Sequence, residues 1–133
     1  MNKAVKFAIL AGSMLAVAVP ASAAITVLGT SRAASCYQAA ENAVPTRRNI
    51  DVCLAALEDD PLTRRERIAT HVNLGILYFF NQDYDTALAR FDTALTIDPN
   101  EPEAVLNKAI TYLRRDENGS EALPLFSRAI DMG

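Results

Sequence analysis

The chain is poor in the residues from which catalytic and metal sites are built. Its 133 residues include one histidine, His71, with two cysteines and five glycines. No Ser-His-Asp or Cys-His set accompanies that histidine, and no glycine-rich phosphate loop occurs. No group of cysteines or carboxylates lies near His71 at metal-ligand spacing. We therefore expect a protein that is not an enzyme and that holds no metal and no cofactor.

An excess of positive charge is also missing. The chain has 13 Lys and Arg against 16 Asp and Glu, a net charge of −3. A nucleic-acid-binding surface needs a basic face, so no nucleic-acid partner is expected. Beyond the first residues, no stretch is apolar enough to span a membrane.

The first residues have the pattern of a secretory signal peptide. Lys3 and Lys6 precede an apolar run over Phe7–Val19, and residues 21–23 form a small-x-small cleavage pattern. The alternative is an uncleaved membrane anchor, but a helix of this run is only about 20 Å long, against ~30 Å of hydrocarbon. The pattern predicts a signal peptide over residues 1–23, no membrane span after cleavage, and a periplasmic or secreted protein.

Beyond this segment, one spacing pattern recurs. Its clearest copy has Leu74-Gly75-x2-Tyr78, then Ala87-x3-Phe91-x2-Ala94, then Pro99. The next copy has Ala109-x2-Tyr112, then Ala122-x3-Phe126-x2-Ala129. The period is 34 residues from Gly75 to Ala109 and 35 from Phe91 to Phe126. A period of this length, built from two helical patterns, is typical of stacked helical hairpins.

The repeats predict an all-α protein, an α-solenoid of two to three antiparallel helix hairpins. A linker over residues 24–29 precedes a repeat domain over 30–133. That domain divides into a degenerate repeat (30–63) and two clearer repeats (68–101 and 102–133). In such an array the small residues let helices approach closely, and the aromatic rings fill the space beside them.

The two cysteines fall in the degenerate repeat. Aligning Asn49-x3-Cys53-x2-Ala56 with Ala87-x3-Phe91-x2-Ala94 places Cys36 opposite Cys53 across the hairpin, as Leu74 is expected to lie opposite Phe91. Facing cysteines in an exported protein favour a structural disulfide. Two free core thiols remain an alternative, and so does a redox pair, although reactive pairs are usually more closely spaced.

The repeated pattern resembles the tetratricopeptide repeat family. That family has W-x2-L-G-x2-Y, then A-x3-F, then P, and here Leu74, Gly75, Tyr78, Ala87, Phe91 and Pro99 stand at those spacings, with His71 in place of Trp. With its paired cysteines and export pattern, the chain as a whole is similar to periplasmic proteins of this family. The resemblance implies an α-solenoid whose concave face, lined by the first helix of each hairpin, binds peptides or protein segments.

Residues on the first helices that lie off the packing pattern are the predicted partner-binding site: Val72, Asn73, Ile76, Phe80, Leu106, Asn107, Ile110 and Arg114. Asn73 and Asn107 are 34 residues apart and therefore occupy equivalent places. In peptide-binding members of the family, an Asn at this place hydrogen-bonds the ligand backbone. The alternative is that both amides are merely solvated.

Two functions of different kinds follow. The first is an adaptor or scaffold that binds a protein or peptide partner on the concave face. The second is a self-associating protein: Leu123, Phe126 and Ile130 leave an apolar edge on the last helix, through which a homodimer would form.

Overall fold

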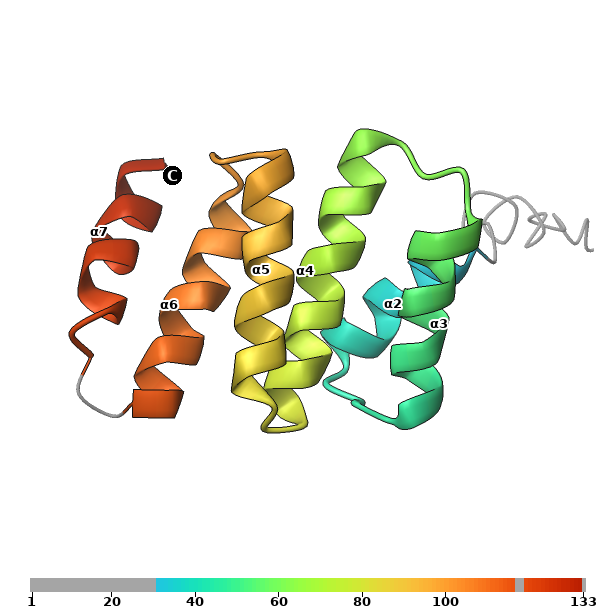
Figure 1. The fold of residues 1–133 in the computed structure, drawn as a ribbon, viewed down its shortest axis with the longest axis horizontal. Helices are drawn as coiled ribbons and strands as arrows, with labels where there is room; N and C mark the ends of the chain where they lie inside the picture. Colours follow the sequence, from blue (N-terminus) through green and yellow to red (C-terminus); the bar gives the residue numbers. More distant parts are fainter. Residues whose placement is uncertain (1–30, 117–118, 133) are drawn as a thin grey trace, which may run out of the picture.

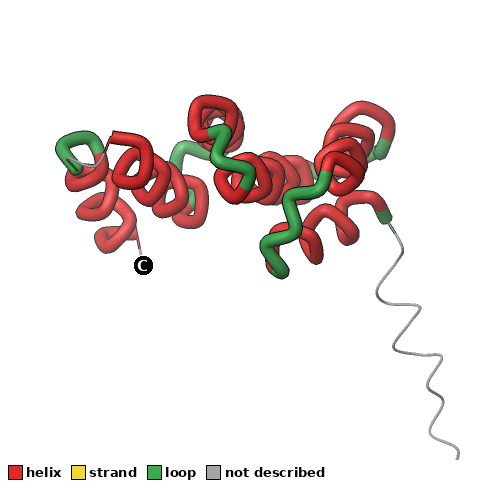
Figure 2. Tube along the Cα trace, turned by 90° about the horizontal axis from the view of Figure 1, so that it is seen from below, coloured by secondary structure: helices red, strands yellow, loops and turns green. Residues whose placement is uncertain are grey.

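The structure is a computed structural model of the chain and describes residues 31–116 and 119–132. The predicted signal peptide and the linker over residues 24–29 lie outside the described residues. Within that part, all regular structure is helical and no strand occurs (Figure 2). The helices are α2 (Arg32–Glu41), α3 (Arg47–Asp59), α4 (Arg64–Phe80), α5 (Tyr84–Ile97), α6 (Pro102–Asp116) and α7 (Ala122–Met132). The prediction of an all-α protein is confirmed.

The helices pack as three consecutive hairpins, α2/α3, α4/α5 and α6/α7, which stand side by side in one row (Figure 1). The first helix α4 contacts the first helices of both other hairpins, α2 and α6. Among the described helices, the second helices α3, α5 and α7 do not contact one another. The first helices therefore form one continuous side of the array. This is the arrangement of a helical-hairpin repeat.

N-cap residues fix where α3, α4 and α5 begin. Thr63 and Glu66 form a capping box before α4, in which each side chain accepts a hydrogen bond from the other residue's backbone N–H. Asp83 caps α5 by accepting from the Thr86 amide, and Thr46 caps α3 by accepting from the Asn49 amide.

Two buried clusters form the core, and each one joins two hairpins. The first unites the two cysteines and neighbouring apolar residues of α2 and α3 with Leu74 and Leu77 of α4. The second unites α4 and α5 with Ala104 of α6, around the fully buried Phe91. No hairpin of α2–α5 therefore completes its core alone, as expected for stacked repeats.

The degenerate first repeat forms a complete hairpin. Its turn repeats the backbone hydrogen bonds of the middle turn: Val44 N–H donates to Ala39 O as Asp83 N–H donates to Tyr78 O. Ala43 and Gln82 occupy equivalent positions in the two turns, and both adopt the left-handed backbone conformation, with φ of 51° and 63°. The hairpin is closed by a disulfide between Cys36 and Cys53, whose Cα atoms are 5.0 Å apart.

This equivalence corrects the predicted alignment of the first helix by one residue. With the turns superposed, Cys36 takes the place of Gly75, not of Leu74. The structure agrees, because Gly75 lies against the ring of Phe91 while Leu74 packs toward the first hairpin. The error arose because the first turn, over residues 42–46, is longer than the middle turn over 81–83.

Candidate functional site

The side of the array formed by α2, α4 and α6, here called the inner face, contains a hollow of about 280 Å³. It lies between α2 and α4. We call it the inner hollow, and it is lined by Ser31, Ala33, Ala34, Tyr37, Glu66, Ala69, Thr70 and Asn73. Small side chains on both helices leave this space open, while the Tyr37 ring stands at its edge with 53% of its surface exposed.

Asn73 is the unusual residue of the inner hollow. Its exposed fraction is only 9%, and its side chain makes no hydrogen bond with any other described residue. Among the described residues, the buried side-chain polar atom that lacks a partner is His71 Nδ1, so the Asn73 amide reaches solvent through the hollow and does not carry the cost of an unpaired buried group. The Asn73 amide is therefore available to a group that enters the hollow.

Asn107 is equivalent to Asn73 but is placed differently. Its Nδ2 donates to the backbone O of Glu103, one turn earlier, at 2.8 Å. It is half-buried, and its amide is partly satisfied by its own helix. Of the two predicted amides, Asn73 is thus the better ligand-binding group.

The other predicted residues divide between surface and core. Leu106 and Phe80 are 43% and 47% exposed, Arg114 is exposed, and Ile76 and Ile110 are half-buried. Phe80 and Arg114 come together at a second hollow, of about 320 Å³, at the carboxyl ends of α4 and α6. Both hollows border the inner face.

Val72 lies in the core and does not belong to the predicted binding site. It is 1% exposed and packs in the core cluster with Phe91, Ala94 and Ala104. Because α6 packs over that side of α4, Val72 has no surface left for a ligand. Its predicted position on an open face is wrong.

Sequence reasoning missed the contribution of α2. The corrected alignment makes Tyr37 the equivalent of Ile76 and Ile110, so these three residues occupy matching places on the three first helices. The Tyr37 hydroxyl donates to Glu41 Oε1 at 3.2 Å. This hydrogen bond raises the pKa of Tyr37, and the charges of Glu41 and, from α6, of Glu103 raise it further. Tyr37 therefore lies close enough to the start of α6 to sense its carboxylate.

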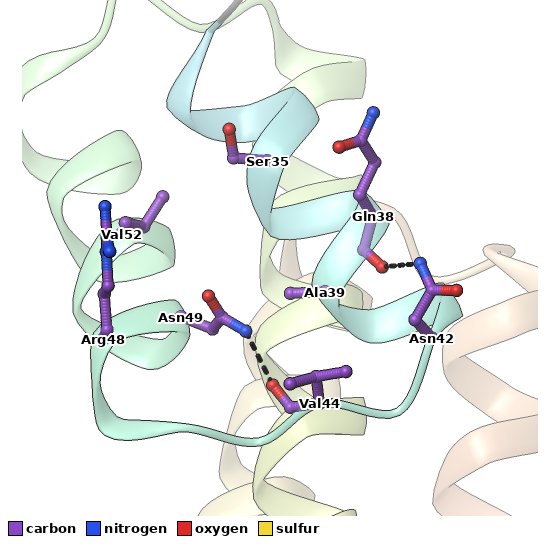
Figure 3. Close-up of a pocket in the computed structure, with 8 residues that line it drawn as sticks. All are labelled: Ser35, Gln38, Ala39, Asn42, Val44, Arg48, Asn49 and Val52. Atoms are coloured by element: carbon purple, nitrogen blue, oxygen red, sulfur yellow. Dashed lines mark hydrogen bonds between the residues drawn. The ribbon is translucent and has the colours of Figure 1, made fainter.

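A larger hollow, of about 520 Å³, lies on the far side of the first hairpin (Figure 3). Only residues of α2, α3 and their turn line it. Two of the three side-chain amides that line it are bonded: Asn49 Nδ2 donates to Val44 O at 2.9 Å, and Asn42 Nδ2 donates to Gln38 O at 2.7 Å (Figure 3). In the middle hairpin the equivalent side packs on a preceding hairpin. We do not assign a ligand site there, because two of its amides are already bonded to backbone carbonyls of α2 and of the turn.

The chain is similar in sequence to known assembly proteins. It is 33% identical over 82 residues to the photosystem I assembly protein Ycf3 of Prochlorococcus marinus strains MIT 9303 and MIT 9313. Each match covers 57% of this chain and 46% of the relative, so the chain spans about half the length of the curated relatives it matches. No family profile matches the chain, and neither does any solved structure.

This comparison corrects the predicted location. The relatives are proteins of photosystem I assembly by name, not periplasmic or secreted proteins. The prediction of a periplasmic or secreted protein is therefore wrong. It depended on the composition of residues 1–23 alone. Of the helices in the described ranges, none has both the length and the apolar character of a membrane span.

Proposed function

We propose that the chain is a protein-binding adaptor that holds a segment of its partner against the inner face. The observation that carries this proposal is Asn73, a residue with only 9% of its surface exposed, whose amide has no partner among the described residues and opens into a hollow between two first helices. Exposed apolar side chains lie on the same side of the array, Phe80 on α4 and Leu106 on α6. An extended segment would hydrogen-bond the amide through its backbone and cover these side chains.

The relatives support the same kind of function. Their name gives photosystem I assembly as their role. We propose that this chain likewise acts on protein partners, and that its helical repeat is of the tetratricopeptide type. The inner face offers an amide, aromatic rings and aliphatic side chains, which suit binding rather than catalysis, and we propose a function other than that of an enzyme.

The proposal is tested by affinity measurements with a partner captured by the full chain and then purified. We expect the double variant Asn73→Ala, Asn107→Ala to bind that partner at least tenfold more weakly than the natural chain. The matched control is Thr93→Ala, an exposed substitution on α5. Full affinity in the double variant would remove the inner face as the binding surface.

A second candidate function is self-association through α7. Leu123 and Ile130 on this helix are 68% and 78% exposed, the largest exposed fractions among the exposed large apolar residues. Burial of such side chains favours association. Light scattering at tens of micromolar would show a dimer that Leu123→Ser, Ile130→Ser converts to a monomer; a monomeric natural chain would exclude this candidate.

A further inference from the structure

Glu66, the carboxylate that lines the inner hollow, is bonded to Thr63, but Tyr37 at the edge of the hollow is close to two further carboxylates. Glu41 lies one turn after Tyr37 on α2, and Glu103 lies in the first turn of α6. Neither carboxylate forms an ion pair with any described residue. By contrast, Arg32 nearby is bound by Asp59 and Asp60, so it does not neutralise this edge.

An aromatic ring completes the surroundings. The Tyr37 ring is half-exposed beside the hollow, and the Glu41 carboxylate accepts a hydrogen bond from its hydroxyl. An exposed tyrosine face attracts a cation, and more strongly where water is excluded. The charge of Glu103, on α6, also reaches Tyr37. Ring and carboxylates together favour a positive group at this place.

The acidic edge and the unpaired amide are independent observations. The carboxylates are exposed and attract a cation from solution, whereas Asn73 offers an amide without a protein partner on the wall of the hollow. A peptide backbone supplies the donor and acceptor that an amide needs, and a basic side chain supplies the charge. A free metal ion or small cation could bind the amide oxygen but would leave the two N–H donors of the amide without an acceptor.

We propose that the inner hollow binds a lysine or arginine side chain of an extended segment in a protein partner, with the cation beside Tyr37 between Glu41 and Glu103 and the segment's backbone bonded to Asn73. This inference rests on the proposed function and specifies the chemistry of the partner. The occupant is a basic segment, not a free carboxyl terminus, which these carboxylates would repel.

The test uses the full chain and three capped nonapeptides that differ only in the central residue, which is lysine, glutamine or glutamate between leucines. Binding is followed by ¹H–¹⁵N NMR titration. We expect the lysine peptide to bind at least threefold more tightly than the glutamine peptide, the glutamate peptide to bind most weakly, and the shifted signals to include the Asn73 side-chain amide. Raising the salt concentration should reduce the lysine preference.

Charge-removing variants separate this inference from the proposed function. Glu41→Gln, Glu103→Gln should abolish the preference for lysine, so that the lysine and glutamine peptides bind with equal affinity. Glu58→Gln, an exposed site on α3, is the matched control and should keep the preference. Equal binding of all three peptides at the inner face would overturn the basic partner but keep the proposed function. Absence of binding by every peptide, or signals shifted only around the hollow of Figure 3, would overturn both.

Discussion

Replacing Gly75 by alanine tests the close approach of α4 and α5. A Cβ atom at Gly75 would lie 2.5 Å from Cε1 of Phe91, 2.8 Å from Cζ and 2.9 Å from Cδ1. Ordinary carbon–carbon contacts are about 3.5–4.0 Å, so the ring would have to move by about 1 Å. Phe91 has no exposed surface and belongs to the cluster shared by α4, α5 and α6, which limits that movement.

The expected change in the free energy of unfolding is the difference between two opposing effects of the added methyl group. Alanine is favoured over glycine inside a helix by about 1 kcal/mol. Overpacking a buried site costs about 1–3 kcal/mol, and the short distances here place Gly75→Ala in the upper part of that range. We expect a net destabilisation of about 1–2 kcal/mol, which lowers the Tm of a domain of this size by about 5–10 °C.

The assay is thermal and urea unfolding followed by circular dichroism at 222 nm. Ala89→Gly, at an exposed place on α5, calibrates helix propensity and should cost about 1 kcal/mol. Phe91→Leu should cost less in the Gly75→Ala background than in the natural chain, because the smaller side chain relieves the clash. A Gly75→Ala variant that is more stable than the natural chain would refute the close packing of this hairpin.

Three further predictions concern stability. Reducing the Cys36–Cys53 disulfide, which closes a loop with a sequence separation of 17, should destabilise the protein by about 3 kcal/mol; a thiol titration of the folded, unreduced chain should find no free thiol, and two reactive thiols would contradict the pairing. Gln82→Gly should stabilise by about 0.5–1 kcal/mol, because Gln82 has a φ of 63° that glycine adopts without strain; Asn81→Gly, at a φ of −80°, is the control and should not stabilise. His71 has a lowered pKa, caused first by burial and then by the charges of Arg90 and Arg67, so the unfolded chain binds its proton before the folded one. Stability should therefore fall as the pH drops below the ordinary histidine pKa of about 6.5. His71→Gln should show a smaller Tm difference between pH 7.5 and 5.5, and an unchanged difference would show that His71 does not carry the effect.

The helices and their pairing could be read from the sequence because local and long-range patterns agree. Small residues and aromatic rings recur at a fixed period, and the cap residues Thr63 and Asp83 mark helix starts directly. The caps depend on residues close in sequence, and the repeated spacing marks the two helices of each hairpin. They predict an all-helical chain of hairpins without knowledge of how one hairpin sits on the next.

The errors at the site have a different origin. Periodicity alone could not show that α6 covers Val72, because that depends on the angle between neighbouring hairpins. Tyr37 was missed because the longer first turn shifts the sequence alignment of α2 with α4 by one residue. A comparison based on the two turns, with Asn42 matched to Asn81, would have placed Tyr37 beside Ile76 and Ile110. The predicted location failed because it relied on composition at the start of the chain.

Site-specific photo-crosslinking tests the central claim most directly. A benzophenone amino acid is placed either at Leu106 on the inner face or at Thr93 on α5, both exposed positions. If the inner face holds a protein segment, the partner should crosslink to the residue-106 probe and not to the residue-93 probe. The Asn73→Ala background should reduce that crosslink. Equal crosslinking from both positions, or crosslinking from residue 93 alone, would contradict the account.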